Sequence, residues 1–467
     1  MQIYLLMKFI YSFRLLLKRS FDRINNENLK KNLLTAIPFW IASIITGLIA
    51  VLYTRLFSAA EDFSGYIFKQ HGWMFFILTP VCFLSAWFMV KVFSPYAKGS
   101  GIPQVMAAIQ IAIPKNDVKI NKLLGVKIIV VKMLSSLVMV IGGGAIGREG
   151  PTIQIAASVF KIIYQVLPGW WPKIAKRNMI VTGAAAGLAA AFNTPLGGIV
   201  FAIEELTKTH FSYFKTAIFS SVIIAGLSAQ AFLGPYLYLG YPKIDNLSPY
   251  IFFDVILVAI IAGLSGSAMS KLILLVFAWK AKLKFTYHHI FFILGCAFLM
   301  AGIAFFIDEG VLGSGKELIV TKLFSPFKYS LWYTPLLRFI GPIISFTTGA
   351  AGGIFAPALG AGASIGSFIS GCFGLSDTNT NLLILAGMVG FLTGVTRSPF
   401  TSIILVLEMT DRHSVIFHLI LAGMVASLVA VIIDKHSLYE HLKKQYVEDI
   451  NKDVTDLKDG VLIEKTH

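Results

Sequence analysis

The feature that most limits the fold of this chain is a series of long apolar stretches, each about as long as a lipid bilayer is thick. Counted at about 20 residues per span, the sequence contains roughly ten to twelve of them. Only 14% of the residues are charged, against about 25% in soluble domains, so polar groups are too few to cover a water-facing surface. We therefore expect an all-α, polytopic membrane protein. The clear segments are 33–57, 73–93, 124–142, 216–234, 251–278, 289–307 and 415–433.

Other apolar segments are shorter and are interrupted by glycine, proline or single charges. In a membrane, a broken helix is tolerated only where protein buries it or where it lines a polar path. The interruptions are therefore where we expect the functional site. These segments are 99–112, 147–164, 182–206, 349–372 and 383–409.

The interrupted segments also occur twice. The stretches 183–195 and 387–399 both run from a glycine to a proline 12 positions later, and a glutamate follows each proline after 9 more positions. Upstream, 147–151 and 353–357 both read Gly-x-x-x-Pro. Repeats with breaks at corresponding places are typical of secondary transporters, whose site lies between the repeats. Frequent glycine and proline in membrane helices is the alternative explanation, and the spacing leaves open whether the repeats are parallel or inverted.

The net charge of +16 comes from basic residues that gather at segment ends and in the N-terminal arm. This pattern favours anchoring at the cytoplasmic face of the membrane over binding of nucleic acid. Residues 4–24 mix apolar and basic positions, which predicts an amphipathic helix on that face rather than a signal peptide. We expect a multi-pass protein of the inner (plasma) membrane with both termini in the cytoplasm.

Three glycine-rich stretches, 99–103, 147–151 and 349–357, each stand just before a helical apolar run. Proline suits the first turn of a helix, and glycine lets the backbone approach a ligand closely. A helix start offers free amide N–H groups and the positive end of the helix dipole. Several such ends that converge would form an anion site, and their partial charges would hold a small anion less tightly than a cluster of lysines.

Four charged residues in apolar surroundings are candidates for function. Glu149 stands at a helix start, where its carboxylate could occupy an anion site and leave on protonation, which would link proton and anion movement; the alternative is a pair with Arg148. Glu204 and Glu205 are either a solvated pair at the membrane boundary or a second proton site. Lys132 is either a buried partner of an acid or a side chain that extends to the interface.

No metal site or cofactor is expected, since the cysteines and histidines show no ligand spacing. Gly310–Lys316 looks like a phosphate-binding loop, but Glu317 replaces the required Ser or Thr. No motif of an intramembrane protease is present, so an enzyme is not expected.

Together these motifs resemble the CLC family of chloride channels and proton-coupled chloride transporters, over about residues 30–440. The resemblance implies two inverted repeats with broken and tilted helices, a homodimer and one anion path in each subunit. The matching stretches are Gly99–Pro103, Gly147–Pro151, Gly183–Pro195, Gly352–Pro357 and Leu438-Tyr439. The expected divisions are a cytoplasmic arm (1–31), two membrane repeats (32–235 and 236–435), and a segment with a pore-facing tyrosine and short tail (436–467).

The resemblance also implies roles for individual residues. Glu149 would be the external gate and proton carrier, Glu205 the internal proton-transfer residue, and Glu204 a possible helper. Chloride, the substrate, would be held by hydroxyls and backbone amides at Ser100, Tyr439, Ile354, Phe355, Arg148 and Gly150.

Two residues depart from the family pattern. Gln104 stands where an acid commonly follows the first glycine-rich stretch, which bears on how tightly protons and chloride are coupled. Ala351 replaces a commoner proline. Because position 205 carries an acid, Glu205, the resemblance favours an electrogenic chloride/proton antiporter. A passive voltage- or pH-gated chloride channel of the same fold is the alternative.

Overall fold

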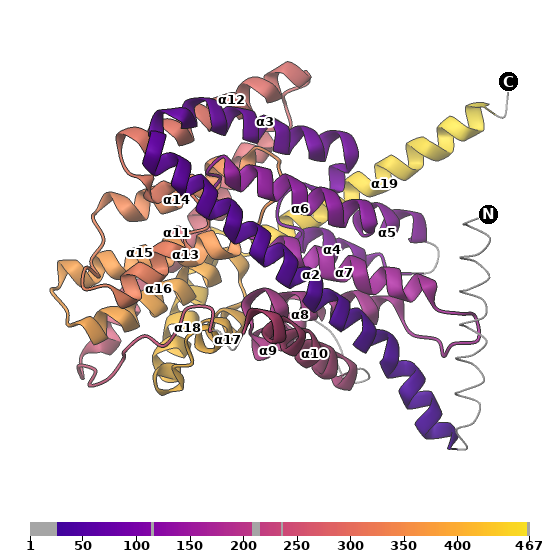
Figure 1. The fold of residues 1–467 in the computed structure, drawn as a ribbon, viewed down its shortest axis with the longest axis horizontal. Helices are drawn as coiled ribbons and strands as arrows, with labels where there is room; N and C mark the ends of the chain where they lie inside the picture. Colours follow the sequence, from indigo (N-terminus) through magenta and orange to yellow (C-terminus); the bar gives the residue numbers. More distant parts are fainter. Residues whose placement is uncertain (1–25, 114–115, 208–214, 235–236, 465–467) are drawn as a thin grey trace.

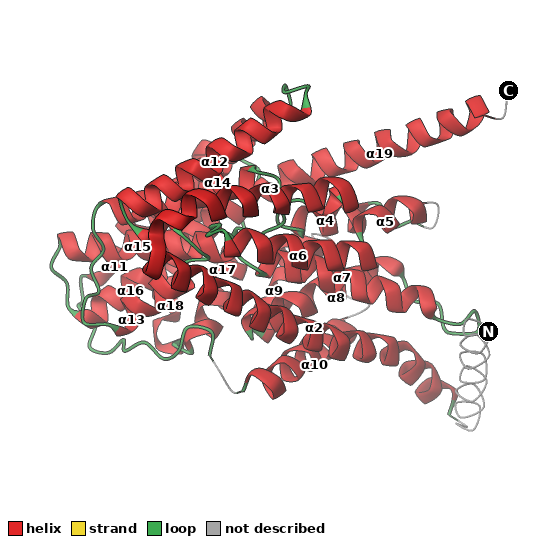
Figure 2. Ribbon diagram, turned by 45° about the horizontal axis from the view of Figure 1, so that its top comes forward, coloured by secondary structure: helices red, strands yellow, loops and turns green. Residues whose placement is uncertain are grey.

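The computed structural model describes residues 26–113, 116–207, 215–234 and 237–464. Over these ranges the chain is built from helices, with isolated β-bridges and no longer strand (Figures 1 and 2). The amphipathic helix expected at 4–24 lies outside the described residues. The helices are α2 (Glu27–His71), α3 (Phe75–Phe93), α4 (Ile102–Gln110), α5 (Asp117–Leu123), α6 (Val126–Ile141), α7 (Glu149–Val166), α8 (Lys176–Phe192), α9 (Pro195–Phe201), α10 (Lys215–Leu233), α11 (Ile251–Lys280), α12 (Thr286–Phe306), α13 (Lys316–Phe324), α14 (Tyr333–Thr347), α15 (Phe355–Cys372), α16 (Asp377–Thr396), α17 (Pro399–Thr410), α18 (Ile416–Ile433) and α19 (Leu438–Glu464).

The prediction of an all-α, multi-pass protein is confirmed. Within the described residues, 8 helical stretches are long and apolar enough to cross a membrane. The sequence prediction missed α14, because Arg338 and Pro342 interrupt its apolar run. The Arg338 side chain is only 4% exposed, and its Nη1 donates to the carbonyl oxygen of Gly313 (3.1 Å). Such a hydrogen bond allows a charged residue to lie inside an apolar layer.

The interrupted segments are broken helices, and the two repeats break in the same way. The segment 182–206 forms α8, α9 and a π-helical turn, and 383–409 forms α16 and α17. The breaks fall at Asn193 and Arg397, which adopt left-handed backbone conformations with φ of 56° and 61°. In both cases the new helix begins with a proline two residues later, as expected from the disfavoured α conformation before proline.

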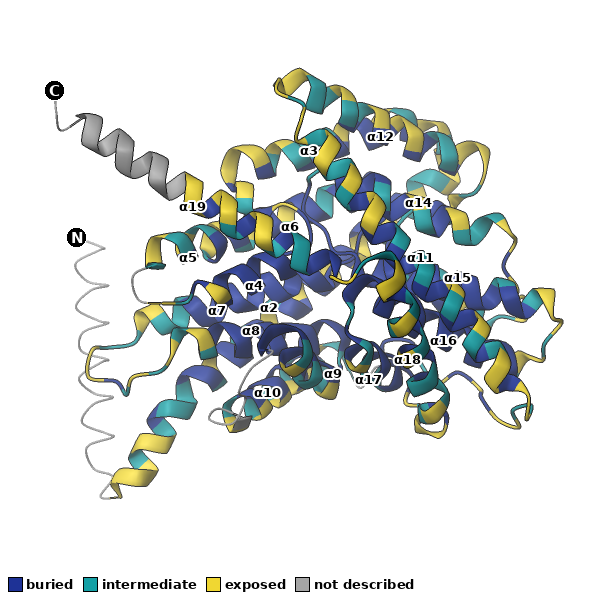
Figure 3. Ribbon diagram, turned by 180° about the vertical axis from the view of Figure 1, so that it is seen from behind, coloured by how far each residue is buried: buried dark blue, intermediate teal, exposed yellow. Residues whose placement is uncertain are grey.

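The centre of the molecule is a close-packed group of helices, drawn in dark blue in Figure 3. Glycines allow this close approach. A Cβ atom on Gly362 of α15 would lie 2.2 Å from the carbonyl oxygen of Gly387 on α16, and one on Gly266 of α11 would lie 2.3 Å from that of Phe391. Helices α7 and α8 meet in the same manner at Gly187. Large apolar side chains on the outer helices, such as Phe291 and Leu428, are exposed and suit a lipid environment.

Equivalent residues of the two repeats make reciprocal contacts. Gly147 and Gly353 exchange both backbone hydrogen bonds, at 2.8 and 2.7 Å. The carboxylate of Glu408 accepts from the amides at the start of α9, and that of Glu204 accepts from the amides at the start of α17. Such exchanged contacts are those of a two-fold relation, so the repeat read from the glycine and proline spacing is a repeat of structure.

Candidate ion-binding site

The site begins with three loops that precede α4, α7 and α15 and meet near the centre of the molecule. The bonds between Gly147 and Gly353 join the second loop to the third. The first loop joins the third through Gly99, whose amide donates to Ala350 (2.9 Å) and whose carbonyl accepts from Gly352 (3.0 Å). The converging helix starts expected from the glycine-rich stretches are therefore present, and they carry the partial positive charge of their free amides.

Ser100 and Tyr439 bring two hydroxyl groups to this centre. The two side chains are 1% and 0% exposed, and the two hydroxyls interact with each other, but neither makes a hydrogen bond of normal geometry to a described residue. Ser100 Oγ lies so close to Gly150 that a Cβ there would be 2.2 Å away. The Tyr439 ring stacks on Phe355, with centroids 6.1 Å apart and planes at 10°. Because an unsatisfied buried hydroxyl is costly, these two groups are suited to a ligand that accepts hydrogen bonds.

Glu149 is the first residue of α7 and is 1% exposed. Its Oε1 accepts from the hydroxyl of Tyr238 (3.2 Å), and its Oε2 has no hydrogen-bond partner among the described residues. A Cβ on Gly147 would lie 2.3 Å from Oε2, so glycine is needed there to leave room for the carboxylate. Beside it, Nη1 of Arg148 donates to the carbonyl oxygen of Thr54 on α2 (3.1 Å), which ties the loop to the body of the protein.

Sequence reasoning missed Tyr238 and Lys316. Tyr238 is 4% exposed, and its ring packs edge-on against Phe192 with centroids 5.0 Å apart. The ammonium group of Lys316 lies 4.4 Å from the centre of the Tyr238 ring. No sequence motif marks Tyr238, which lies in an irregular segment before α11. Lys316 is the last residue of the apparent phosphate-binding loop, so its actual neighbours could only be found in three dimensions.

Glu205 and Glu204 are not the solvated pair that was one of the two sequence interpretations. Glu205 is 4% exposed, and its Oε2 accepts from the hydroxyl of Ser398 (2.7 Å). Glu204 is half-buried, and its Oε2 accepts from both the amide and the hydroxyl of Thr401 (2.7 Å each). Both acids contact the start of α17, but Glu204 acts there as a helix cap.

Both interpretations of Lys132 were wrong. The side chain is 0% exposed, so it does not reach the interface, and its Nζ donates to backbone carbonyls rather than to an acid. The acceptors are Ala97 (2.9 Å) and Gly99 (2.8 Å), with Lys98 at 3.5 Å. Lys132 therefore holds the loop that carries Ser100.

The two departures from the family pattern have local explanations. The side-chain amide of Gln104 donates to the carbonyl of Lys98 (2.6 Å), the carbonyl of Tyr96 (3.2 Å) and the Tyr446 hydroxyl (3.0 Å). A carboxylate could not donate to these carbonyls. The amide of Ala351 donates to the hydroxyl of Ser135 (3.1 Å), a bond that proline could not make.

Comparison with known proteins gives relatives along most of the chain. The "H(+)/Cl(-) exchange transporter ClcA" of Salmonella typhimurium is 28% identical over 442 residues, which cover 88% of this chain and 89% of the relative. The protein of the same name from Citrobacter koseri is 28% identical over 420 residues, or 85% and 86% of the two chains.

Solved structures share the fold. A slow cyanobacterial Cl⁻/H⁺ antiporter matches with a TM-score of 0.76 and 21% identity, over 90% of this chain and 99% of that one. A CLC-type fluoride/proton antiporter matches with a TM-score of 0.71 and 18% identity, over 89% and 98%.

The fold and the site define a multi-pass helical membrane protein with a candidate ion site between two broken-helix repeats. The family model described as "Voltage gated chloride channel" matches residues 81–431. The chain therefore belongs to this family, which is the one that its motifs resemble.

Proposed function

We propose that this protein is an electrogenic chloride/proton antiporter. The observation that carries the proposal is a group of three buried polar atoms, Ser100 Oγ, Tyr439 Oη and Glu149 Oε2, that make no hydrogen bond of normal geometry among the described residues. They lie where helix starts converge, so a chloride ion would be held by the two hydroxyls and by the amides of Ile354 and Phe355. The relatives are named as proton/chloride exchange transporters, and this supports the same function.

Glu149 would act as the gate and proton carrier on the outer side. As a carboxylate, it competes with chloride for the amides around Arg148 and Gly150, because both are anions attracted to the same helix start. Protonation removes that attraction, the side chain leaves, and chloride takes its position. Since one group alternates between binding a proton and giving way to chloride, the two ions move in opposite directions and net charge crosses the membrane.

Glu205 would transfer protons on the inner side. Its burial and its hydrogen bond from Ser398 in the other repeat support this role, since a proton that leaves Glu149 needs an acceptor on the far side of the chloride site. Glu204 is the weaker candidate, because both of its oxygens accept hydrogen bonds at the start of α17.

The test is the reversal potential of the reconstituted protein under combined chloride and proton gradients. An antiporter gives a potential that depends on both gradients, whereas a passive channel follows chloride alone. Glu149→Gln should leave chloride flux without proton movement, and Glu205→Gln should do the same. Glu448→Gln is the matched control, since Glu448 is exposed. A reversal potential that ignores the proton gradient in the unmodified protein would reject antiport in favour of the channel.

The assembly and orientation follow from the same proposal. We infer a homodimer with one chloride path in each subunit, in the inner membrane, with both termini in the cytoplasm and the repeats divided at 235/236. Cross-linking of the purified protein tests the dimer, and labelling of single cysteines introduced near each terminus in intact cells tests the orientation.

A further inference from the structure

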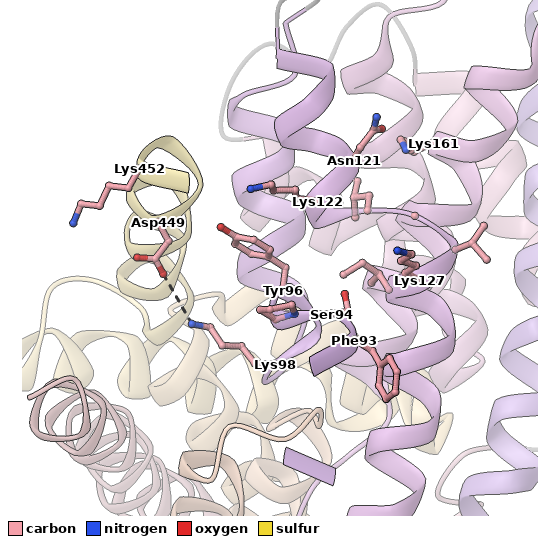
Figure 4. Close-up of a pocket in the computed structure, with 15 residues that line it drawn as sticks. Phe93, Ser94, Tyr96, Lys98, Asn121, Lys122, Lys127, Lys161, Asp449 and Lys452 are labelled. Atoms are coloured by element: carbon pink, nitrogen blue, oxygen red, sulfur yellow. Dashed lines mark ion pairs between the residues drawn. The ribbon is translucent and has the colours of Figure 1, made fainter. Parts of the chain in front are cut away.

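A cavity of about 770 Å³ lies beside the segment 93–98, between α5, α6, α7 and α19 (Figure 4). None of the residues assigned above to chloride or to protons lines it. The basic residues in its wall are Lys98, Lys122, Lys127, Lys161 and Lys452.

The cavity is strongly basic. Its lining includes five lysines and a single acid, Asp449, whose Oδ2 lies 3.9 Å from Nζ of Lys98. In Figure 4 this ion pair lies on one side of the cavity, and Lys127 and Lys161 lie on the other. The lining residues themselves therefore carry an excess of positive charge, which attracts anions.

Lys161 shows that this charge belongs to a site and not only to a solvated surface. The residue is 5% exposed, lines the cavity, and makes no hydrogen bond or ion pair with another described residue. The stem of the side chain is therefore buried in the protein, and its ammonium group is left to the cavity rather than to a protein partner. The first residues of α6, Val126 to Ile128, line the same cavity, and the amides of a helix start are free to bind an anion.

The rest of the wall favours an anion with an apolar tail. Phe93 and Val126 line the cavity and are 62% and 63% exposed. They stand at the end of α3 and the start of α6, two helices with membrane-spanning composition. A ligand held by the lysines could therefore extend its hydrocarbon chains along this apolar edge into the bilayer.

We propose that the cavity binds the phosphate-bearing headgroup of an anionic phospholipid, with Lys161 and the start of α6 as the central contacts. Lys122 and Lys127 add to the attraction. Free phosphate shares the headgroup chemistry, but it has no hydrocarbon chains to pack against the apolar edge of the cavity.

The experiment measures lipid binding to the purified full-length protein by native mass spectrometry in mild detergent. Dioleoyl phosphatidylglycerol and dioleoyl phosphatidylcholine, which have the same acyl chains, are added separately. Near a membrane surface each lysine contributes enough to change affinity about fivefold. We expect Lys161→Met and Lys127→Met each to weaken phosphatidylglycerol binding by about that factor, and Lys161→Arg to retain most of it.

The controls separate this site from general attraction to positive charge. Lys282→Met removes an exposed lysine elsewhere and should leave lipid binding unchanged. Lys127 is also exposed, so its variant tests the proposal even if Lys161→Met does not fold. Equal binding of the two lipids, or equal losses for Lys127→Met and Lys282→Met, would overturn the proposal. Displacement of phosphatidylglycerol by an equal concentration of inorganic phosphate would overturn the choice of a lipid.

Discussion

At the scale of single residues, the buried polar side chains differ in how their hydrogen-bonding capacity is used. Lys132 and Gln104 direct their donors at the backbone carbonyls that precede α4, so they hold a loop in place. The hydroxyls of Ser100 and Tyr439 make no hydrogen bond of normal geometry to a described residue. The first pair therefore positions the site, and the second pair is available to an ion.

Tyr238 gives a prediction about the gate. Tyr238→Phe removes the hydrogen bond to Glu149 Oε1, and a bond to a charged group contributes about 1.5–3 kcal/mol. The carboxylate is then held less firmly in the anion position, so chloride flux into proteoliposomes at neutral pH should rise about tenfold or more. Tyr241→Phe is the control, because Tyr241 is 58% exposed. Equal fluxes in the two variants would show that Tyr238 does not hold the gate.

Lys132 gives a prediction about stability. Lys132→Met leaves the buried carbonyl of Ala97 without its donor, at about 1–3 kcal/mol. The Gly99 carbonyl loses one of its two donors and keeps the amide of Gly352. We expect a lower thermal unfolding temperature and weaker chloride binding by titration calorimetry, because Ser100 is next to the released loop. Lys284→Met, at an exposed position, should change neither quantity. Unchanged chloride affinity together with lower stability would limit Lys132 to a purely structural role.

At the scale of helices, the broken segments of the two repeats are joined by hydrogen bonds that each repeat makes to the other. Glu408 caps α9, and Glu204 caps α17. The glycine, proline and glutamate spacing predicted both breaks, because those residue types act within a few positions of the chain. It could not identify what the glutamates contact, since each partner lies in the other repeat. For the same reason, the sequence showed that Glu204 and Glu205 were unusual without showing their roles. The role of Lys132 was hidden because its acceptors, Ala97 and Gly99, are 35 and 33 positions away in the chain.

The caps predict equal effects for two acids in different repeats. Glu204→Ala and Glu408→Ala should each destabilise the protein by about 1–2 kcal/mol, the usual contribution of a helix cap with a favourable dipole interaction. The loss would be measured as a lower midpoint of thermal unfolding, with exposed Glu448→Ala as the control. The Glu204→Ala protein that remains folded should keep its proton-to-chloride ratio. A changed proton-to-chloride ratio would show that Glu204 takes part in proton transfer.

At the scale of the whole molecule, the candidate ion site depends on helices that pack closely together at glycine residues. Apolar segment lengths predicted a polytopic bundle, and the site motifs predicted which helix starts converge. The order in which helices pack could not be read from them, because a membrane helix that is apolar all round has no sequence face that marks its neighbour. Helix α14 was missed for a related reason, since Arg338 is masked from lipid only by the surrounding helices.

Gly362 tests how closely the site depends on this packing. In Gly362→Ala the new Cβ would meet the carbonyl oxygen of Gly387 at 2.2 Å, so α15 and α16 must move apart, at a cost of about 1–3 kcal/mol. Because α15 begins with Phe355, whose amide faces the proposed chloride position, chloride affinity should fall together with thermal stability. Gly295→Ala is the matched control: Gly295 lies within α12 with no atom within 4 Å of the added Cβ, so alanine there should stabilise the helix by about 0.5–1 kcal/mol. If Gly362→Ala lowered stability but left chloride affinity unchanged, the start of α15 would be held by its loop contacts with Gly147 and Gly99 rather than by the helix behind it.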